Sequence, residues 1–132
     1  MAISDIPGLS ALRTSMQWHQ QRQRVLAENV SNADTPNYQP RDLMRPTAQA
    51  LANGAQQGLT MVRTSAAHIG PQGGIASFAA ERRGGSETRP AGNAVSLDDE
   101  MMKVAQNQMD YAAATSLYTR SLGLLKTAIG KR

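Results

Sequence analysis

Residues 97–129 read LDDEMMKVAQNQMDYAAATSLYTRSLGLLKTAI, and this stretch decides the fold. Steps of four and three residues along it reach ten positions, and only Gln108 and Thr115 among them are polar. The other eight are apolar or aromatic: Leu97, Met101, Val104, Tyr111, Tyr118, Leu122, Leu125 and Ile129. An apolar repeat of about 3.5 residues is typical of a helix that packs along its length on other helices. We therefore predict one helix over residues 97–129, about 50 Å long.

The ends of this helix are also marked in the sequence. Ser96 suits the N-cap position, and Asp99 follows it in the spacing of a capping box. Asp98 and Glu100 add negative charge to the first turn, and Lys126 adds positive charge near the end, which suits the helix dipole. Successive residues on a helix point in different directions, so we interpret the three acidic residues as capping groups and not as a metal site.

A second, weaker helix is predicted from residue 9 to about residue 33. Pro7-Gly8 limits it upstream, and Asp34-Thr35-Pro36 ends it. Its apolar positions follow the same repeat: Leu9, Leu12, Met16, Leu26 and Val30. The centre, residues 17–24, is polar and includes His19. This helix is therefore marginal alone and needs tertiary partners.

Between the two helices lies a segment that is poor in core-forming residues. Residues 44–94 hold 8 of the 11 glycines and 3 of the 6 prolines, with only eight large apolar residues. We expect a largely irregular middle with one short strand at residues 59–64. The sequence thus predicts a helix and turn in residues 1–43, a flexible middle in 44–94 and a heptad helix in 95–132. The fold class is mostly α, and the two helices pair as one coiled-coil-like assembly domain.

The composition argues against most catalytic and binding functions. The chain has no Cys, and its two histidines, His19 and His68, lie far apart in the sequence, so we expect no metal site, no cofactor and no thiol nucleophile. Common catalytic and phosphate-binding motifs do not occur, and we expect no enzyme. The net charge of +4 comes from scattered arginines, so nucleic-acid binding is not expected. We also expect no membrane span and no cleaved secretory signal.

The segment AENVSNADTPNY, residues 27–38, carries the most specific pattern in the chain. In its last four residues, Pro36 fixes φ at the second position of a turn, and Asn37 tolerates the positive φ that a type II turn requires at the third. Asn29 and Asn32 can bond the backbone where a helix ends. The pattern predicts that the helix stops here and the chain turns sharply, with Tyr38 as an anchor.

This segment resembles the Asn-x-Ala-Asn-x-x-Thr-Pro-Gly-Tyr signature of the bacterial flagellar axial proteins, which form the rod, the hook and the hook–filament junction. Five residues match it: Asn29, Asn32, Thr35, Pro36 and Tyr38. Ser31 stands where the family usually has Ala, and Asn37 where it usually has Gly. Residues 60–69 and 92–111 are similar to a short rod protein of the flagellar basal body, and the length of 132 residues suits that group.

The resemblance implies a structural role without catalysis. Proteins of this family pair their terminal helices into the inner domain of a tubular axle, and they are exported unfolded by the flagellar type III apparatus. We therefore expect a subunit of the proximal, periplasmic rod that assembles helically and forms part of the drive shaft. Its expected partners are copies of itself, other rod proteins, the rod-base adaptor and the membrane ring. Two alternatives stay open: another short rod protein of the family, or a cytoplasmic helical adaptor or chaperone.

Overall fold

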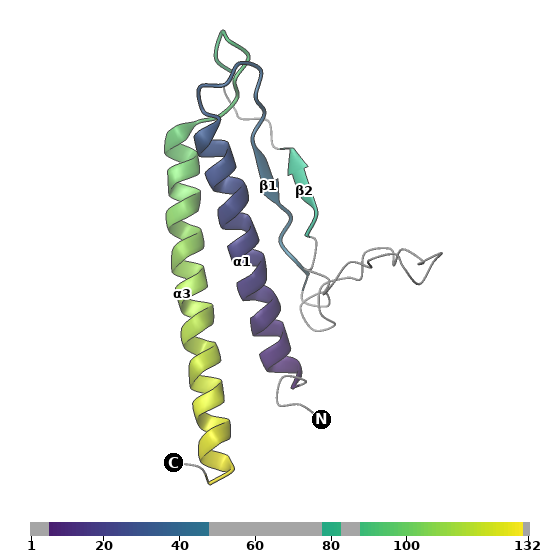
Figure 1. Ribbon diagram of the computed structural model, residues 1–132, viewed down its shortest axis with the longest axis vertical. Coiled ribbons are helices and arrows are strands. Elements are labelled where there is room, and N and C mark those ends of the chain that lie inside the picture. The colour runs from purple at the N-terminus through teal and green to yellow at the C-terminus, as the bar shows by residue number, and fades with distance from the viewer. Residues whose placement is uncertain (1–5, 48–77, 83–87, 131–132) are drawn as a thin grey trace, which may run out of the picture.

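A computed structural model describes residues 6–47, 78–82 and 88–130. Two long helices dominate it: α1, Pro7–Ser31, and α3, Leu97–Ala128 (Figure 1). They lie side by side and antiparallel, so that the end of α1 is close to the start of α3. The mostly helical fold with long terminal helices is therefore confirmed, and the direction of their pairing, which the sequence left open, is antiparallel.

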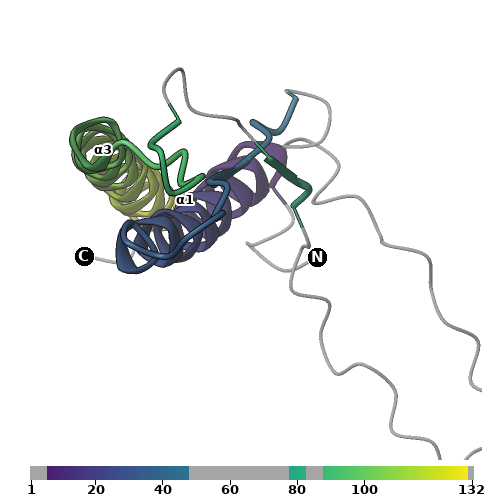
Figure 2. The same cartoon turned by 90° about the horizontal axis from the view of Figure 1, so that it is seen from above.

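Two short strands complete the described part of the chain. Strand β1, Arg41–Leu43, pairs antiparallel with β2, Ala80–Arg82, with Arg41 opposite Arg82 and Leu43 opposite Ala80. The pair of strands packs on α1 through β1, and Figure 2 shows it from above, beside the two helices. The strand predicted at residues 59–64 lies outside the described residues, as does most of the predicted middle segment.

The helix ends differ from the predicted ones in two ways. Pro7 is the first residue of α1 instead of a barrier before it, because its fixed φ suits the first helical turn and its missing N–H would have no partner there. Ser96 is the N-cap of α3, but its side chain makes no cap hydrogen bond, so the predicted capping box is wrong. The carboxylate of Glu100 is also directed inward to α1 and does not serve as a solvated charge on the first turn.

In the part of the chain that the structure describes, polar and charged residues make up about half of the interior. Among the described residues, the buried apolar side chains are Leu9, Trp18, Leu26, Leu43, Ala94, Val95 and Ala114. The buried polar or charged ones are Thr14, His19, Asn29, Asp42, Asn93, Glu100 and Asn107. Burial of a polar group is tolerable only where hydrogen bonds replace those to water. The specific contacts between the helices are therefore hydrogen bonds as much as apolar packing.

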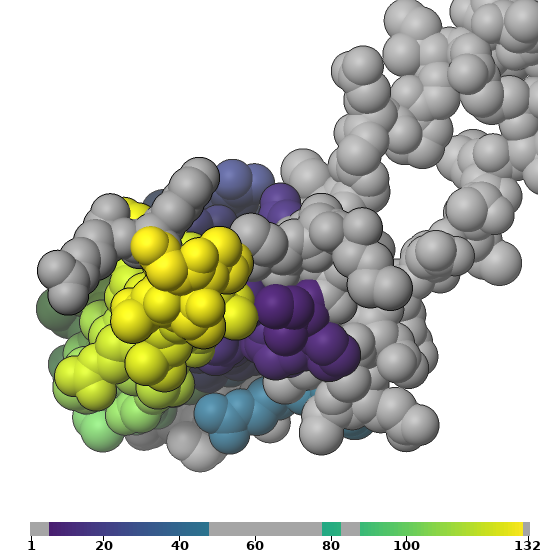
Figure 3. All heavy atoms as spheres, turned by 90° about the horizontal axis from the view of Figure 1, so that it is seen from below, coloured from purple at the N-terminus to yellow at the C-terminus, as the bar shows by residue number. Residues whose placement is uncertain are grey.

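The helix pair is more open at the end where α1 begins and α3 ends. Seen from below in Figure 3, the last turns of α3 lie at the surface beside the first turn of α1. Leu122 and Leu125 are only half-buried there, and Ile129 is 63% exposed. Helix α3 is thus packed closely at the end next to residues 29–38, which we call the turn motif, and more loosely beside the start of α1, although Leu9 is buried there.

Candidate functional site

Asn29 is the centre of the junction between α1, β1 and α3. Its amide nitrogen Nδ2 donates to the backbone oxygen of Arg41 (2.7 Å) and to Oε2 of Glu100 (2.8 Å). Its oxygen Oδ1 accepts from the backbone N–H of Arg41 (3.0 Å) and from the hydroxyl of Tyr38 (3.2 Å). The side chain is only 1% exposed, and both its donors and its acceptor are used. This one residue therefore holds three elements together.

Glu100 is the partner that the sequence analysis did not recognise. It is 2% exposed, and its second carboxylate oxygen accepts a hydrogen bond from Nζ of Lys103 at 2.6 Å. A buried carboxylate needs such partners, because an isolated charge away from water is costly. The signal that could have revealed it is its seven-residue spacing from Asn107, which places both on one helix face.

The predicted turn is present, and it is fastened to the loop before α3. Asn37 has a positive φ of 58°, as the pattern predicts, and the N–H of Tyr38 bonds the oxygen of Thr35 at 3.4 Å. Thr35 also donates its hydroxyl to Oδ1 of Asn32 at 3.1 Å. Asn93 donates from Nδ2 to the backbone oxygens of Asn32 (3.0 Å) and Thr35 (2.7 Å). The turn motif thus has a defined structural task, which is to join the end of α1 to the approach to α3.

A glycine makes this close approach possible. Gly92 has a φ of 77°, and a Cβ atom at this position would collide with the side chain of Asn37. Two backbone hydrogen bonds connect the same segments, from the N–H of Asn37 to Ala91 (3.1 Å) and from the N–H of Ala94 to Tyr38 (3.1 Å). Residues with side chains rarely adopt this φ, so the contact depends on glycine.

A second polar cluster lies further along the helix pair. Nδ1 of His19 donates to Oδ1 of Asn107 at 2.8 Å, and Nδ2 of Asn107 donates to the backbone oxygen of His19 and to Oε1 of Gln23, both at 3.0 Å. The Trp18 ring meets the His19 ring edge to face. The centre of the first helix is polar, and the sequence therefore predicts little burial there. In the structure, His19 and Gln23 from this part of α1 form the hydrogen bonds with Asn107.

Arg22 and Asp42 join α1 to β1. The guanidinium donates from Nε (2.9 Å) and from one NH2 group (2.8 Å) to the two carboxylate oxygens, and it lies 5.3 Å from the centre of the Trp18 ring. Burial raises the pKa of Asp42, but the hydrogen bonds and the positive charge of Arg22 outweigh this effect, so that the pKa lies below its ordinary value. The pair is a structural clamp that keeps β1 on the helix.

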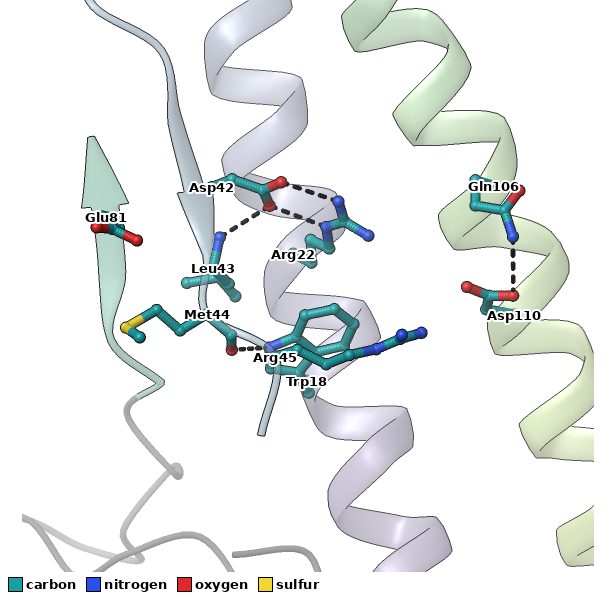
Figure 4. A pocket seen from close by; sticks show the side chains of 9 residues that line it. All are labelled: Trp18, Arg22, Asp42, Leu43, Met44, Arg45, Glu81, Gln106 and Asp110. Atoms are coloured by element: carbon teal, nitrogen blue, oxygen red, sulfur yellow. Dashed lines mark hydrogen bonds and ion pairs between the residues drawn. The ribbon is translucent and has the colours of Figure 1, made fainter. Parts of the chain in front are cut away.

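The clamp lines an open pocket of about 460 Å³ between β1, α1 and α3 (Figure 4). Its lining residues are Trp18, Arg22, Asp42, Leu43, Met44, Arg45, Glu81, Gln106 and Asp110. Several of its polar groups already have partners: the Trp18 indole donates to the oxygen of Met44 (2.8 Å), and Gln106 donates to Asp110 (3.2 Å). The arrangement places no nucleophile beside a base, so it offers no evident catalytic chemistry.

The described residues contain no cluster of three or more His, Asp or Glu side chains that could hold a metal ion. Within the same part of the chain, neither helix has an apolar stretch that could cross a bilayer.

The apolar residues predicted to form the assembly seam fall into three groups. Leu9 and Leu26 are buried. Eight are half-buried: Leu12, Met16, Val30, Val104, Tyr111, Tyr118, Leu122 and Leu125. Leu97, Met101 and Ile129 are exposed. The structure thus buries two of the predicted seam residues, leaves eight partly exposed and leaves the remaining three open.

Helix α3 carries a second apolar stripe, which was not predicted from the sequence. Met102, Met109, Leu117 and Leu124 are 71%, 62%, 53% and 73% exposed. Their spacings of seven, eight and seven residues place them on one side of the helix. This side, which we call the outer face of α3, has no partner among the described residues. One apolar repeat marks one face of a helix only, and the signal for the other face is a second repeat that is offset from the first.

Comparison with known proteins identifies relatives of this chain. A family model described as "Flagella basal body rod protein" matches residues 9–39, which span most of α1 and the turn motif. The chain is 36% identical to the flagellar basal body rod protein FlgB of Escherichia coli K12, over 73% of each sequence. It is 28% identical to the protein of the same name from Aeromonas hydrophila over the whole of both chains, and 28% identical to that of Bacillus subtilis over 82% of this chain and 81% of the relative.

Proposed function

Because the chain belongs to the FlgB family of flagellar basal body rod proteins, we propose that it is a structural subunit of the proximal rod that assembles helically through α1 and α3 and forms part of the drive shaft. Membership of the family makes the chain a component of the flagellar basal body rod. The mode of assembly and the position within the rod are the proposed part.

The outer face of α3 is the observation that carries the proposal. Its four large apolar side chains are more than half exposed in the single chain. Complete burial of such a side chain stabilises by roughly 1.5–3 kcal/mol, and association with another chain would provide this gain. Large apolar patches on a protein surface typically mark interaction sites. The exposed residues of the predicted seam, Leu97, Met101 and Ile129, extend the apolar surface that neighbouring subunits can cover.

The other partners follow from the same proposal. The subunit contacts copies of itself, other rod proteins, the rod-base adaptor and the membrane ring, and it reaches the periplasm unfolded through the flagellar type III export apparatus without a cleaved signal. The polar contact between α1 and α3 supports export of the unfolded chain, because a pair of helices with few apolar contacts is easily separated. No catalytic role and no cofactor belong to the proposal.

The alternative from another class of protein is a cytoplasmic helical adaptor or chaperone. Axle subunits assemble by head-to-tail contacts that can extend into an open-ended structure, whereas an adaptor forms a closed complex with its client. The relatives compared above carry the name of one rod protein, which favours the rod over the adaptor and over a different short rod protein.

Substitution of Met109 by Asp tests the proposal. The charge would be buried against a neighbour on assembly, which costs several kcal/mol, whereas in the free subunit the side chain is mostly exposed and the cost is small. We expect Met109→Asp to be produced and exported normally and to abolish motility, with no rods in isolated basal bodies. Thr119→Asp is the matched control, because Thr119 is exposed on α3 but lies off the outer face. Normal rods with Met109→Asp, or equal damage by both changes, would refute this role of the outer face.

A further inference from the structure

We propose that the outer face of α3 also pairs with the same face of a second copy of this chain, in an antiparallel, two-fold symmetric dimer. The dimer itself is argued from the geometry of α3, and only its biological role rests on the proposed function. The spacing, the small residues and the charges of α3 all favour this pairing.

The spacing of the outer face is symmetric about Ala113. Met102 and Leu124 each lie eleven residues from Ala113, and Met109 and Leu117 each lie four residues from it. When two copies of α3 run in opposite directions with Ala113 opposite Ala113, each Met102 lies opposite the Leu124 of the other copy. Each Met109 likewise lies opposite a Leu117. All eight exposed side chains of the two outer faces therefore find apolar partners in one register.

Small residues occupy the centre of this arrangement. Ala112, Ala113 and Ser116 are exposed and lie between the two halves of the outer face. Small side chains at a helix crossing allow the two axes to approach closely, and the larger side chains above and below then interlock. A centre of long or charged residues would have kept the two helices apart.

The charges of α3 favour the antiparallel direction. Asp98 and Asp99 are exposed at the start of the helix, and Lys126 lies in its last turn. Antiparallel pairing brings the acidic end of one copy beside the basic end of the other and aligns the helix dipoles favourably, whereas parallel pairing brings like charges together. Arg120 on the outer side lies opposite Gln106, since both are seven residues from Ala113, so that two arginines do not meet.

The dimer would give the free subunit a second state. A two-fold pair is closed and cannot grow into a tube, because each copy uses its outer face on the other. The same side chains are the ones proposed to contact neighbours in the rod. Pairing therefore covers the assembly surface of unassembled subunits, and it must dissociate before a subunit joins the rod.

Engineered cysteines test the register, since the natural chain has none that would interfere. We expect oxidation of Ala113→Cys to give a covalent dimer, because this position lies near the two-fold axis and a disulfide requires Cβ atoms about 4 Å apart. Met102→Cys and Leu124→Cys should give little covalent dimer separately and much when the two proteins are mixed. Efficient cross-linking of Met102→Cys alone would show parallel pairing and overturn the proposal.

Sedimentation of the full chain without cysteines tests the dimer itself. We expect a reversible monomer–dimer equilibrium that Met109→Asp abolishes and that Thr119→Asp retains. A native chain that is monomeric at every attainable concentration, or that forms open-ended fibres without a dimer, would overturn the proposal. The dimer and the role in rod assembly can be refuted separately. If the native chain is monomeric and Met109→Asp builds no rods, only the dimer is refuted. If the native chain is a dimer and Met109→Asp builds normal rods, only the role of the outer face in assembly is refuted.

Discussion

Asn29 shows why the turn motif needs an asparagine at this position. The buried side chain must donate to a carboxylate and to a carbonyl while it accepts from a backbone N–H and from a tyrosine hydroxyl. Aspartate has the shape but lacks the donors, and an apolar residue has neither donors nor acceptors. Glutamine would carry the same groups about one bond length too far from the backbone. Only asparagine satisfies all four contacts in this space.

Substitutions of Asn29 should therefore rank in a definite order. Asn29→Ala leaves buried partners without hydrogen bonds and should lower the free energy of unfolding by about 2–4 kcal/mol. Asn29→Asp should cost more at neutral pH, because it places a second carboxylate beside Glu100, and less in acid, where one carboxyl takes up a proton. Chemical unfolding at two pH values measures both effects. Ser31→Ala, an exposed change two residues away, is the control and should be nearly silent. An equal cost of both Asn29 variants at all pH values would contradict the contact with Glu100.

The clamp of Arg22 and Asp42 predicts a pH dependence with a definite sign. The pKa of Asp42 is lowered from its ordinary value of 3.8, since the hydrogen bonds and charge of Arg22 outweigh the effect of burial. A lowered pKa contributes stability that is fully present above the ordinary value and is lost as the pH falls through the folded-state value. The stability difference between the natural chain and Asp42→Asn should therefore shrink between about pH 5 and about pH 2. A difference that stays constant over this range would show that the ion pair does not stabilise the fold.

At the scale of the elements, the contact between α1 and α3 depends on polar residues at heptad spacing. Glu100, Asn107 and Ala114 are the buried residues of α3, each seven residues from the next. Buried polar residues at such positions fix the register of paired helices and reduce their stability. Here the register matches Asn29 with Glu100 and His19 with Asn107, which a shift by one turn would separate.

Replacement of the His19–Asn107 pair tests this account. Asn107→Leu alone leaves the His19 ring and Gln23 without their partner and should destabilise the fold by about 2–3 kcal/mol. The double change, with His19→Leu as well, should recover most of this loss, because two apolar residues then face each other. Thermal unfolding of the three proteins gives the comparison, with exposed Gln108→Leu as the control. A double variant no more stable than Asn107→Leu would mean that packing, and not hydrogen bonding, decides the cost.

The two helices were largely predictable from the sequence, whereas the strands β1 and β2 and the contacts between the elements were not. The repeat of residues 97–129 predicted α3 to within one residue at its end, and the turn chemistry of Pro36 and Asn37 predicted the positive φ. Periodicity shows which residues share a helix face, but it does not show which face meets which partner. Glu100 and Asn107 are buried because residues far away in the sequence supply their hydrogen bonds. Such pairings of polar residues cannot be read from one sequence alone.

For the whole molecule, the hydrogen bonds between α1 and α3 gather toward one end of the helix pair, and the burial of α3 declines toward the other end, where Leu9 of α1 is still buried. Leu26, Asn29, Val95 and Glu100 are all at most 3% exposed, and they gather where α1 ends and α3 begins. At the other end Leu122 and Leu125 are half-buried. The pair is therefore held at one end by a network and at the other by partial apolar contact, and it should open from the loose end.

Hydrogen exchange along α3 measures this opening. Amides of residues 103–111 should exchange slowest, because their turns follow the junction and include the His19–Asn107 contact, and amides of residues 118–128 should exchange fastest. The measurement should be made at a protein concentration too low for two copies to pair through the outer face of α3, because a second copy would also protect the last turns of α3. Asn29→Ala provides the internal check: without the junction, exchange near residues 103–111 should approach that of the distal turns. Uniform protection along α3, or slower exchange in residues 118–128 than near the junction, would contradict the view that the junction holds the molecule together.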